Sequence, residues 1–127
     1  MYELIDGPLR RTGDGYEIPI RFDWYRSLPL SCVSVSVRFD GLPVPDDAIR
    51  FHVNERDYAL DEMAALVDEF WFVLDAAKLR IRTEEPVVDG THDVEVEIAL
   101  RIPYLFNEDT GNVLTVWSRP RATMVLA

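Results

Sequence analysis

The sequence predicts an all-β protein, an antiparallel β-sandwich of about eight or nine strands with one short helix. Apolar and polar residues alternate at period two in several segments, which is typical of strands with one buried face. Gly, Pro and Asp residues separate these segments at regular intervals, and helical spacing occurs in only one short stretch. A length of 127 residues fits one core. We therefore expect a single domain over residues 1–127.

The first half of the chain contains three alternating segments, at residues 18–22, 33–39 and 49–53. Pro19 lacks a backbone N–H, so the first segment is predicted at a sheet edge. Asp40-Gly41 follows the second and predicts a tight hairpin turn, because both central residues of that turn need positive φ. After the third, a turn at residues 54–57 and a return strand through Tyr58 are expected.

Residues 60–68 form the one predicted helix. Leu60, Met63, Ala64 and Val67 recur there at three- and four-residue spacing, which places them on one helical face. The segment is only one or two turns long. It is therefore expected to connect strands rather than to build the core.

The second half of the chain contains the remaining strands. Residues 69–75 are apolar on both faces, which predicts a central strand covered on both sides. Alternation then predicts strands at residues 78–82, 93–102, 113–117 and 121–126, the last two separated by Pro120. The side chains expected in one shared core are Val33, Val35, Val37, Phe39, Val94, Val96, Ile98, Leu100 and Ile102.

Charge and hydropathy exclude several classes of partner. The net charge of −10 argues against binding to nucleic acid and to anionic membrane surfaces, since both would repel this chain. No uncharged apolar stretch approaches the length of a membrane span. The N-terminal residues lack the basic and apolar regions of a signal peptide. A cytoplasmic protein is expected.

The sequence offers no recognisable catalytic or metal-binding residues. Cys32 is the single cysteine, so no internal disulfide is possible, and we expect it to be a buried thiol. His52 and His92 are isolated and are expected at the surface, His92 in a turn. A carboxylate pair of the glycosidase type is disfavoured, because the acidic residues that could form one are expected in turns or on a solvated strand face. Those residues are Asp46, Asp47, Glu84, Glu85, Glu95 and Glu97.

Two loops are unusually aromatic and contain proline, at residues 24–30 and 102–112. Aromatic residues together with Arg are enriched at protein interfaces. Two interpretations stay open: the loops contact a partner, or they fold back on their own core. The candidate interface residues are Trp24, Tyr25, Arg26, Leu28, Pro29, Leu30, Tyr104, Leu105, Phe106 and Asn107.

Three segments in order, YRSLPLSC (residues 25–32), FWFVLD (70–75) and HDVEVEIALRIPYL (92–105), resemble the small β subunit of bacterial C-glycoside deglycosidases. The resemblance implies a β-sandwich docked on a larger TIM-barrel α subunit. It further implies that the α subunit holds the acid and base groups and a divalent metal, manganese or similar. No cofactor is expected in this chain, and no catalytic residue can be carried over to it.

The resemblance implies a carbon–carbon lyase acting on 3-keto derivatives of plant C-glycosides, such as flavonoid C-glucosides. A C-glycosidic bond has no leaving oxygen to protonate. The C3 ketone makes the C2 proton acidic, so a base can remove that proton and the aglycone can leave by elimination. Two alternatives stay open beside this function. One is a stand-alone carbohydrate- or protein-binding sandwich, and the other is a self-sufficient carboxylate hydrolase.

Overall fold

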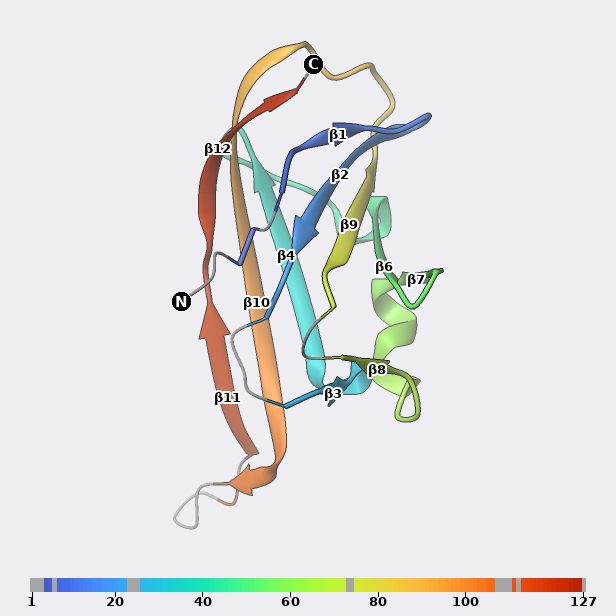
Figure 1. Ribbon diagram of the computed structural model, residues 1–127, viewed down its shortest axis with the longest axis vertical. Helices are drawn as coiled ribbons and strands as arrows, with labels where there is room; N and C mark the ends of the chain where they lie inside the picture. Colours follow the sequence, from blue (N-terminus) through green and yellow to red (C-terminus); the bar gives the residue numbers. More distant parts are fainter. Residues whose placement is uncertain are drawn as a thin grey trace.

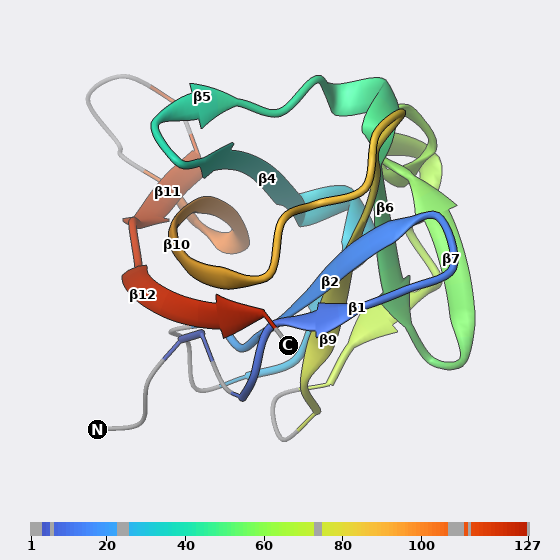
Figure 2. The same cartoon turned by 90° about the horizontal axis from the view of Figure 1, so that it is seen from above.

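The computed structural model describes residues 4–5, 7–22, 26–72, 75–106, 111 and 113–126. These residues form two antiparallel sheets and a small two-stranded ribbon, which confirms the predicted all-β sandwich (Figures 1 and 2). Among the described residues, twelve strands occur, and four of them (β1, β3, β5 and β8) are only two residues long. The eight longer strands correspond to the number expected from the sequence.

The first sheet has the strand order β1-β2-β9-β6-β7. Its strands are β1 (Arg10–Arg11), β2 (Gly15–Ile20), β9 (Ala77–Arg82), β6 (Ile49–Val53) and β7 (Arg56–Ala59). Pro19 was predicted to place β2 at a sheet edge, and this is wrong for the strand as a whole, since β2 lies between β1 and β9 and its last residue, Ile20, also bridges Ile5. β1 pairs with Tyr16 and Glu17, whereas Pro19 lies beyond the end of β1 and pairs with β9 alone.

The second sheet is built around β10 (Gly90–Phe106), which runs along the whole length of the molecule (Figure 1). One side of β10 pairs with β4 (Val33–Phe39), which pairs in turn with β5 (Leu42–Pro43). The other side pairs with two successive strands, β12 (Arg121–Leu126) along its first part and β11 (Val113–Ser118) along its second. β10 extends the predicted strand at both ends.

The ribbon consists of β3 (Leu28–Pro29) and β8 (Phe70–Trp71). Residues 69–75 were predicted to form a central strand, and this prediction is wrong. Within the described part of that segment only Phe70 and Trp71 pair, and they pair with β3 alone. The two faces of the segment are apolar for different reasons. Trp71 is fully buried in the core, whereas Phe70 and Phe72 are 36% and 51% exposed on the opposite side.

In the described ranges, three short 3-10 helices connect the strands. They are η1 (Leu30–Cys32), η2 (Asp46–Ala48) and η3 (Leu60–Ala65). The helix predicted at residues 60–68 is thus present in shortened form and as a 3-10 helix. It begins where the Glu62 carboxylate accepts a hydrogen bond from the Ala59 backbone N–H (2.6 Å), and the Leu66 N–H closes it on Met63 O. Of the helices among the described residues, none is long and apolar enough to cross a membrane.

Both predicted hairpin turns are confirmed by backbone geometry. Asp40 and Gly41 have φ values of 51° and 80°, and Asn54 and Glu55 have φ values of 54° and 64°. Two consecutive residues with positive φ match the right-handed twist of the flanking strands. These turns join β4 to β5 and β6 to β7, and so fix the register of both hairpins.

The predicted core is confirmed, and it lies between the two sheets. The five inward residues of β10, from Val94 to Ile102 at every second position, are at most 1% exposed. On β4, Val33 and Val37 are buried, while Val35 and Phe39 are partly buried against the same cluster. The first sheet contributes Ile18, Ile20, Phe51, Leu79 and Ile81.

Candidate functional site

The first candidate loop contributes to the core as well as to the surface. Leu28 and Leu30 are 1% and 0% exposed, so a partner would not reach either side chain. Pro29, between them, is partly exposed, and Arg26 is exposed. Trp24 and Tyr25 lie outside the described residues. The ribbon therefore turns alternate side chains in opposite directions, and only part of the loop remains available for contact with another molecule.

The second candidate loop is largely a continuation of a strand. β10 extends through Tyr104, Leu105 and Phe106, and β11 follows after residues 107–112. The side chains of those three residues, and Asn107 altogether, lie outside the part of the chain that is described. Whether they contact a partner stays a prediction.

The side of the ribbon that faces away from the core carries two phenylalanine rings. Phe70 and Phe72 stack on each other, with ring centroids 6.3 Å apart and an angle of 28° between the planes. Phe70 pairs with Pro29 across the ribbon, and Val67, three residues earlier in the chain, is 61% exposed. The exposure of Phe70 and Phe72 was not predicted from the sequence. The apolar residues on both faces of residues 69–75 were nevertheless a signal, because they predicted a second packing partner beyond the core of this chain.

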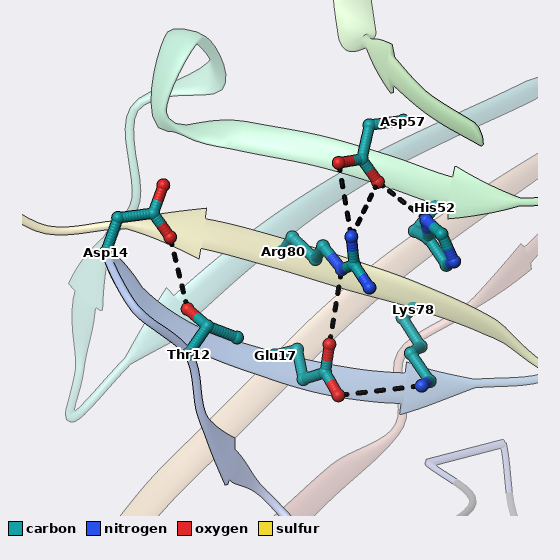
Figure 3. Close-up of polar contacts among 7 residues, drawn as sticks. All are labelled: Thr12, Asp14, Glu17, His52, Asp57, Lys78 and Arg80. Carbon is teal, nitrogen blue, oxygen red and sulfur yellow. Dashed lines mark hydrogen bonds and ion pairs between the residues drawn. The ribbon is translucent and has the colours of Figure 1, made fainter. Parts of the chain in front are cut away.

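The outer face of the first sheet carries a ladder of ion pairs across four strands (Figure 3). Glu17, only 8% exposed, lies 3.2 Å from Arg80 Nε and 3.6 Å from Lys78 Nζ. Arg80 also donates to both carboxylate oxygens of Asp57 at 3.2 Å, and Asp57 lies 2.6 Å from His52 Nδ1. Glu17, Lys78, Arg80 and Asp57 each face an opposite charge, so the ladder ties β2, β9 and β7 together, and the contact of Asp57 with His52 adds β6.

Within the described part of the chain, the outer face of the second sheet carries an exposed aromatic side chain, Trp117. Trp117 is 53% exposed and covers Ala99, its cross-strand partner. The Arg119 guanidinium lies 5.4 Å from the centre of the indole ring and donates to Glu97 at 3.0 Å. A groove of about 330 Å³ beside the ring is lined mainly by polar residues. These include Ser34, Ser36, Glu97, Arg101 and Thr115.

His92 is not the surface histidine that was predicted. It lies in β10 rather than in a turn and is 9% exposed. Its Nδ1 lies 2.6 Å from Asp40 Oδ2, and its Nε2 lies 2.6 Å from the carbonyl oxygen of Val88. The Phe39 ring stacks on the imidazole at 4.8 Å. Both ring nitrogens face acceptors, and only the protonated imidazole can donate to both.

This geometry predicts a pH-dependent stability. The hydrogen bond to Asp40 raises the pKa of His92, and the same contact lowers the pKa of Asp40. The His92 contribution to folding is full below about pH 6.5 and is lost as pH rises through the raised folded-state pKa. The Asp40 contribution is full above about pH 4 and is lost as pH falls through the lowered pKa.

We therefore expect the free energy of unfolding to fall as pH rises from about 6.5 through the raised folded-state pKa of His92, in urea titrations at fixed ionic strength. His92→Gln removes the titrating group, and Asp40→Asn removes its partner while keeping a residue that tolerates positive φ. Both variants should show a flatter profile over this range. A variant profile as steep as that of the parent would contradict the assignment.

Three of the other candidate groups have structural partners or are covered. Cys32 is buried at 8% exposure, as predicted. Glu95 pairs with Arg38 and Arg121, and Glu97 pairs with Arg119. Among the described residues, no three His, Cys, Asp or Glu side chains gather in a way that could hold a metal ion. That this chain carries no metal site or catalytic residue stays a prediction.

Known proteins resemble this chain over most of its length. Residues 10–104 match the family model of the C-glycoside deglycosidase beta subunit. A C-glycoside deglycosidase beta subunit from Arthrobacter globiformis is 34% identical over 120 residues, covering 91% of this chain and 88% of that protein. One from Microbacterium trichothecenolyticum is 34% identical over 105 residues, covering 82% and 79%. A 3'-dehydrocarminate deglycosidase beta subunit from a Microbacterium species is 41% identical over 104 residues, covering 80% and 77%.

Proposed function

The chain belongs to the family of C-glycoside deglycosidase beta subunits, and on that premise we propose that it is the accessory subunit of a heteromeric carbon–carbon lyase. The observation that carries this proposal is the family match, which spans both sheets of the sandwich from β1 to the second half of β10. A subunit designated beta implies a partner subunit.

We assign the chemistry to that partner, a larger TIM-barrel α subunit. The substrates would be 3-keto C-glycosides of plant aromatic compounds, and a base on the α subunit would remove the acidic C2 proton before the aglycone leaves. A divalent metal such as manganese, bound by the α subunit, would stabilise the resulting enolate. A TIM barrel carries its catalytic groups on loops at one end, where a docked sandwich can order those loops and exclude water. The complex would be cytoplasmic.

The partners of the histidines in this chain support an accessory role. His92 is held by Asp40 and Val88 near the end of the sandwich, and His52 is held by Asp57 in the ion-pair ladder. Both rings are thereby assigned to the stability of the fold. We therefore assign the catalytic acid and base of the elimination to the α subunit rather than to these histidines.

A direct test is to assay the purified chain alone with manganese and a 3-keto C-glucoside. We expect no release of aglycone, because the proposal places the base and the metal on the α subunit. Chromatography of the reaction mixture measures the aglycone. Turnover by this chain without the α subunit would refute the accessory role.

A second candidate function is carbohydrate binding by a stand-alone sandwich, and the outer face of the second sheet favours it. Trp117 offers an exposed ring beside serine, arginine and glutamate side chains, which suits stacking under a sugar with hydrogen bonds to its hydroxyls. Calorimetry with C-glucosides discriminates the two functions: binding by the isolated chain that Trp117→Ala abolishes would favour this alternative.

A further inference from the structure

We propose that the α subunit docks on the outward side of the β3–β8 ribbon, a surface formed by Pro29, Phe70 and Phe72 that we term the ribbon face. This proposal rests on the proposed function, since it names the surface through which the accessory subunit would act. It also reduces the set of interface residues predicted from the sequence: among its described side chains, Pro29 is partly exposed and Arg26 is exposed, so both can take part.

Alternation within the ribbon creates this face. Leu28 pairs with Trp71, and both side chains point into the core at 1% and 0% exposure. Their neighbours Pro29 and Phe70 pair with each other and point outward. Phe72 follows at 51% exposure and stacks on Phe70. Exposed adjacent aromatic rings that gain from burial are typical anchors of an interface.

Contacts on the core side of the ribbon fix its position. The Trp71 ring packs against Phe22 at 4.6 Å and Phe51 at 5.2 Å, and its Nε1 donates to Asp75 O at 2.9 Å. The backbone carbonyl of Phe70 accepts a hydrogen bond from Asn54 Nδ2 at 2.7 Å. Because these contacts order the backbone before any partner arrives, binding would cost little conformational entropy.

The surroundings indicate a partner other than a second copy of this chain. Asp68 and Asp75 are exposed on either side of the two phenylalanines in the chain, and the net charge is −10. A symmetric dimer through this face would bring like charges together, which is unfavourable. A different chain with an apolar depression and a basic rim would complement it. We therefore infer that the α subunit covers this face.

Other exposed apolar residues lie on different elements. Leu42, Val88, Leu114, Trp117 and Val125 are exposed among the described residues, on β5, before β10, on β11 and on β12. Trp117 is the best matched control because it is also an exposed aromatic residue, but it lies on the outer face of the second sheet and contacts Arg119. A substitution of Trp117 therefore distinguishes the loss of any exposed aromatic ring from the loss of a ring on the ribbon face.

The test uses the full chain and the α subunit of the same organism, with affinity measured by calorimetry or surface plasmon resonance. Phe70→Ser/Phe72→Ser is expected to weaken binding at least tenfold, whereas Trp117→Ser should stay within about threefold of the parent. Circular dichroism confirms that the variants are folded. If the double variant unfolds, Phe72→Arg is measured instead and should show the same loss, because it places a cation in the expected apolar depression, close to the basic rim.

The outcomes separate the two proposals. If the parent chain does not bind the α subunit, the proposed function fails. If the parent binds and both ribbon-face variants bind equally well, only the docking site is overturned. Analytical ultracentrifugation of the isolated chain tests whether a second copy binds this face instead. A dimer that Phe70→Ser/Phe72→Ser dissociates would show that it does, and would also overturn the proposal.

Discussion

Trp71→Ala is expected to lower the free energy of unfolding by about 3–5 kcal/mol. Trp71 is fully buried, where its ring contacts those of Phe22 and Phe51 and its indole N–H donates to Asp75 O. Alanine would remove the ring, leave a cavity between the ribbon and the first sheet, and leave that carbonyl without its donor. Urea unfolding followed by circular dichroism measures the change.

The neighbouring residue provides the control. Phe72 is 51% exposed, so Phe72→Ala should change the free energy of unfolding by less than about 1 kcal/mol. A Trp71→Ala midpoint equal to that of the parent would show that the ring is not packed in the core. In that case the outward direction of Phe70, which alternation ties to the inward direction of Trp71, would lose its support as well.

Ile98→Ala has the second largest expected effect, a loss of about 2–5 kcal/mol. Ile98 lies near the middle of the long strand β10, opposite Val35 of β4 on one side and Ser118 of β11 on the other, and it is 0% exposed. Truncation would leave a cavity at the centre of the second sheet, where neighbouring strands cannot move inward without losing their pairing.

The matched control for Ile98 is the residue before it. Glu97 points to the opposite face and forms an ion pair with Arg119 at 3.0 Å, and exposed pairs contribute little to stability. Glu97→Ala should therefore cost less than about 1 kcal/mol. Equal destabilisation by both substitutions would contradict the inward and outward assignment of β10.

Strict alternation made the long strands predictable. β12 has the predicted bounds, and β4 likewise matches, because one wet face and one buried face leave a clear period-two pattern. The Asp40-Gly41 turn was predictable for a different reason: the positive φ values that it needs depend on these two residues alone. The family resemblance then supplied the functional class, which no spacing of residues in this chain could have given.

The ribbon was not predictable, because its signal is ambiguous. An apolar run on both faces fits a central strand, and it fits equally a short surface ribbon whose outward side awaits a partner. Leu28 and Leu30 point inward and Phe70 points outward because of pairing between segments some forty residues apart, which composition does not record. His92 was misplaced likewise, since its partner Asp40 is distant in sequence.

The measurement that tests the central claim most directly is a titration of this chain into its α subunit. The α subunit is held at a fixed concentration with a metal and a 3-keto C-glucoside, and the initial rate of aglycone release is followed. We predict that the rate rises with added chain and reaches a plateau at a fixed molar ratio, as expected for a required accessory subunit. A rate already maximal without this chain, or unchanged by it at any ratio, would contradict the account.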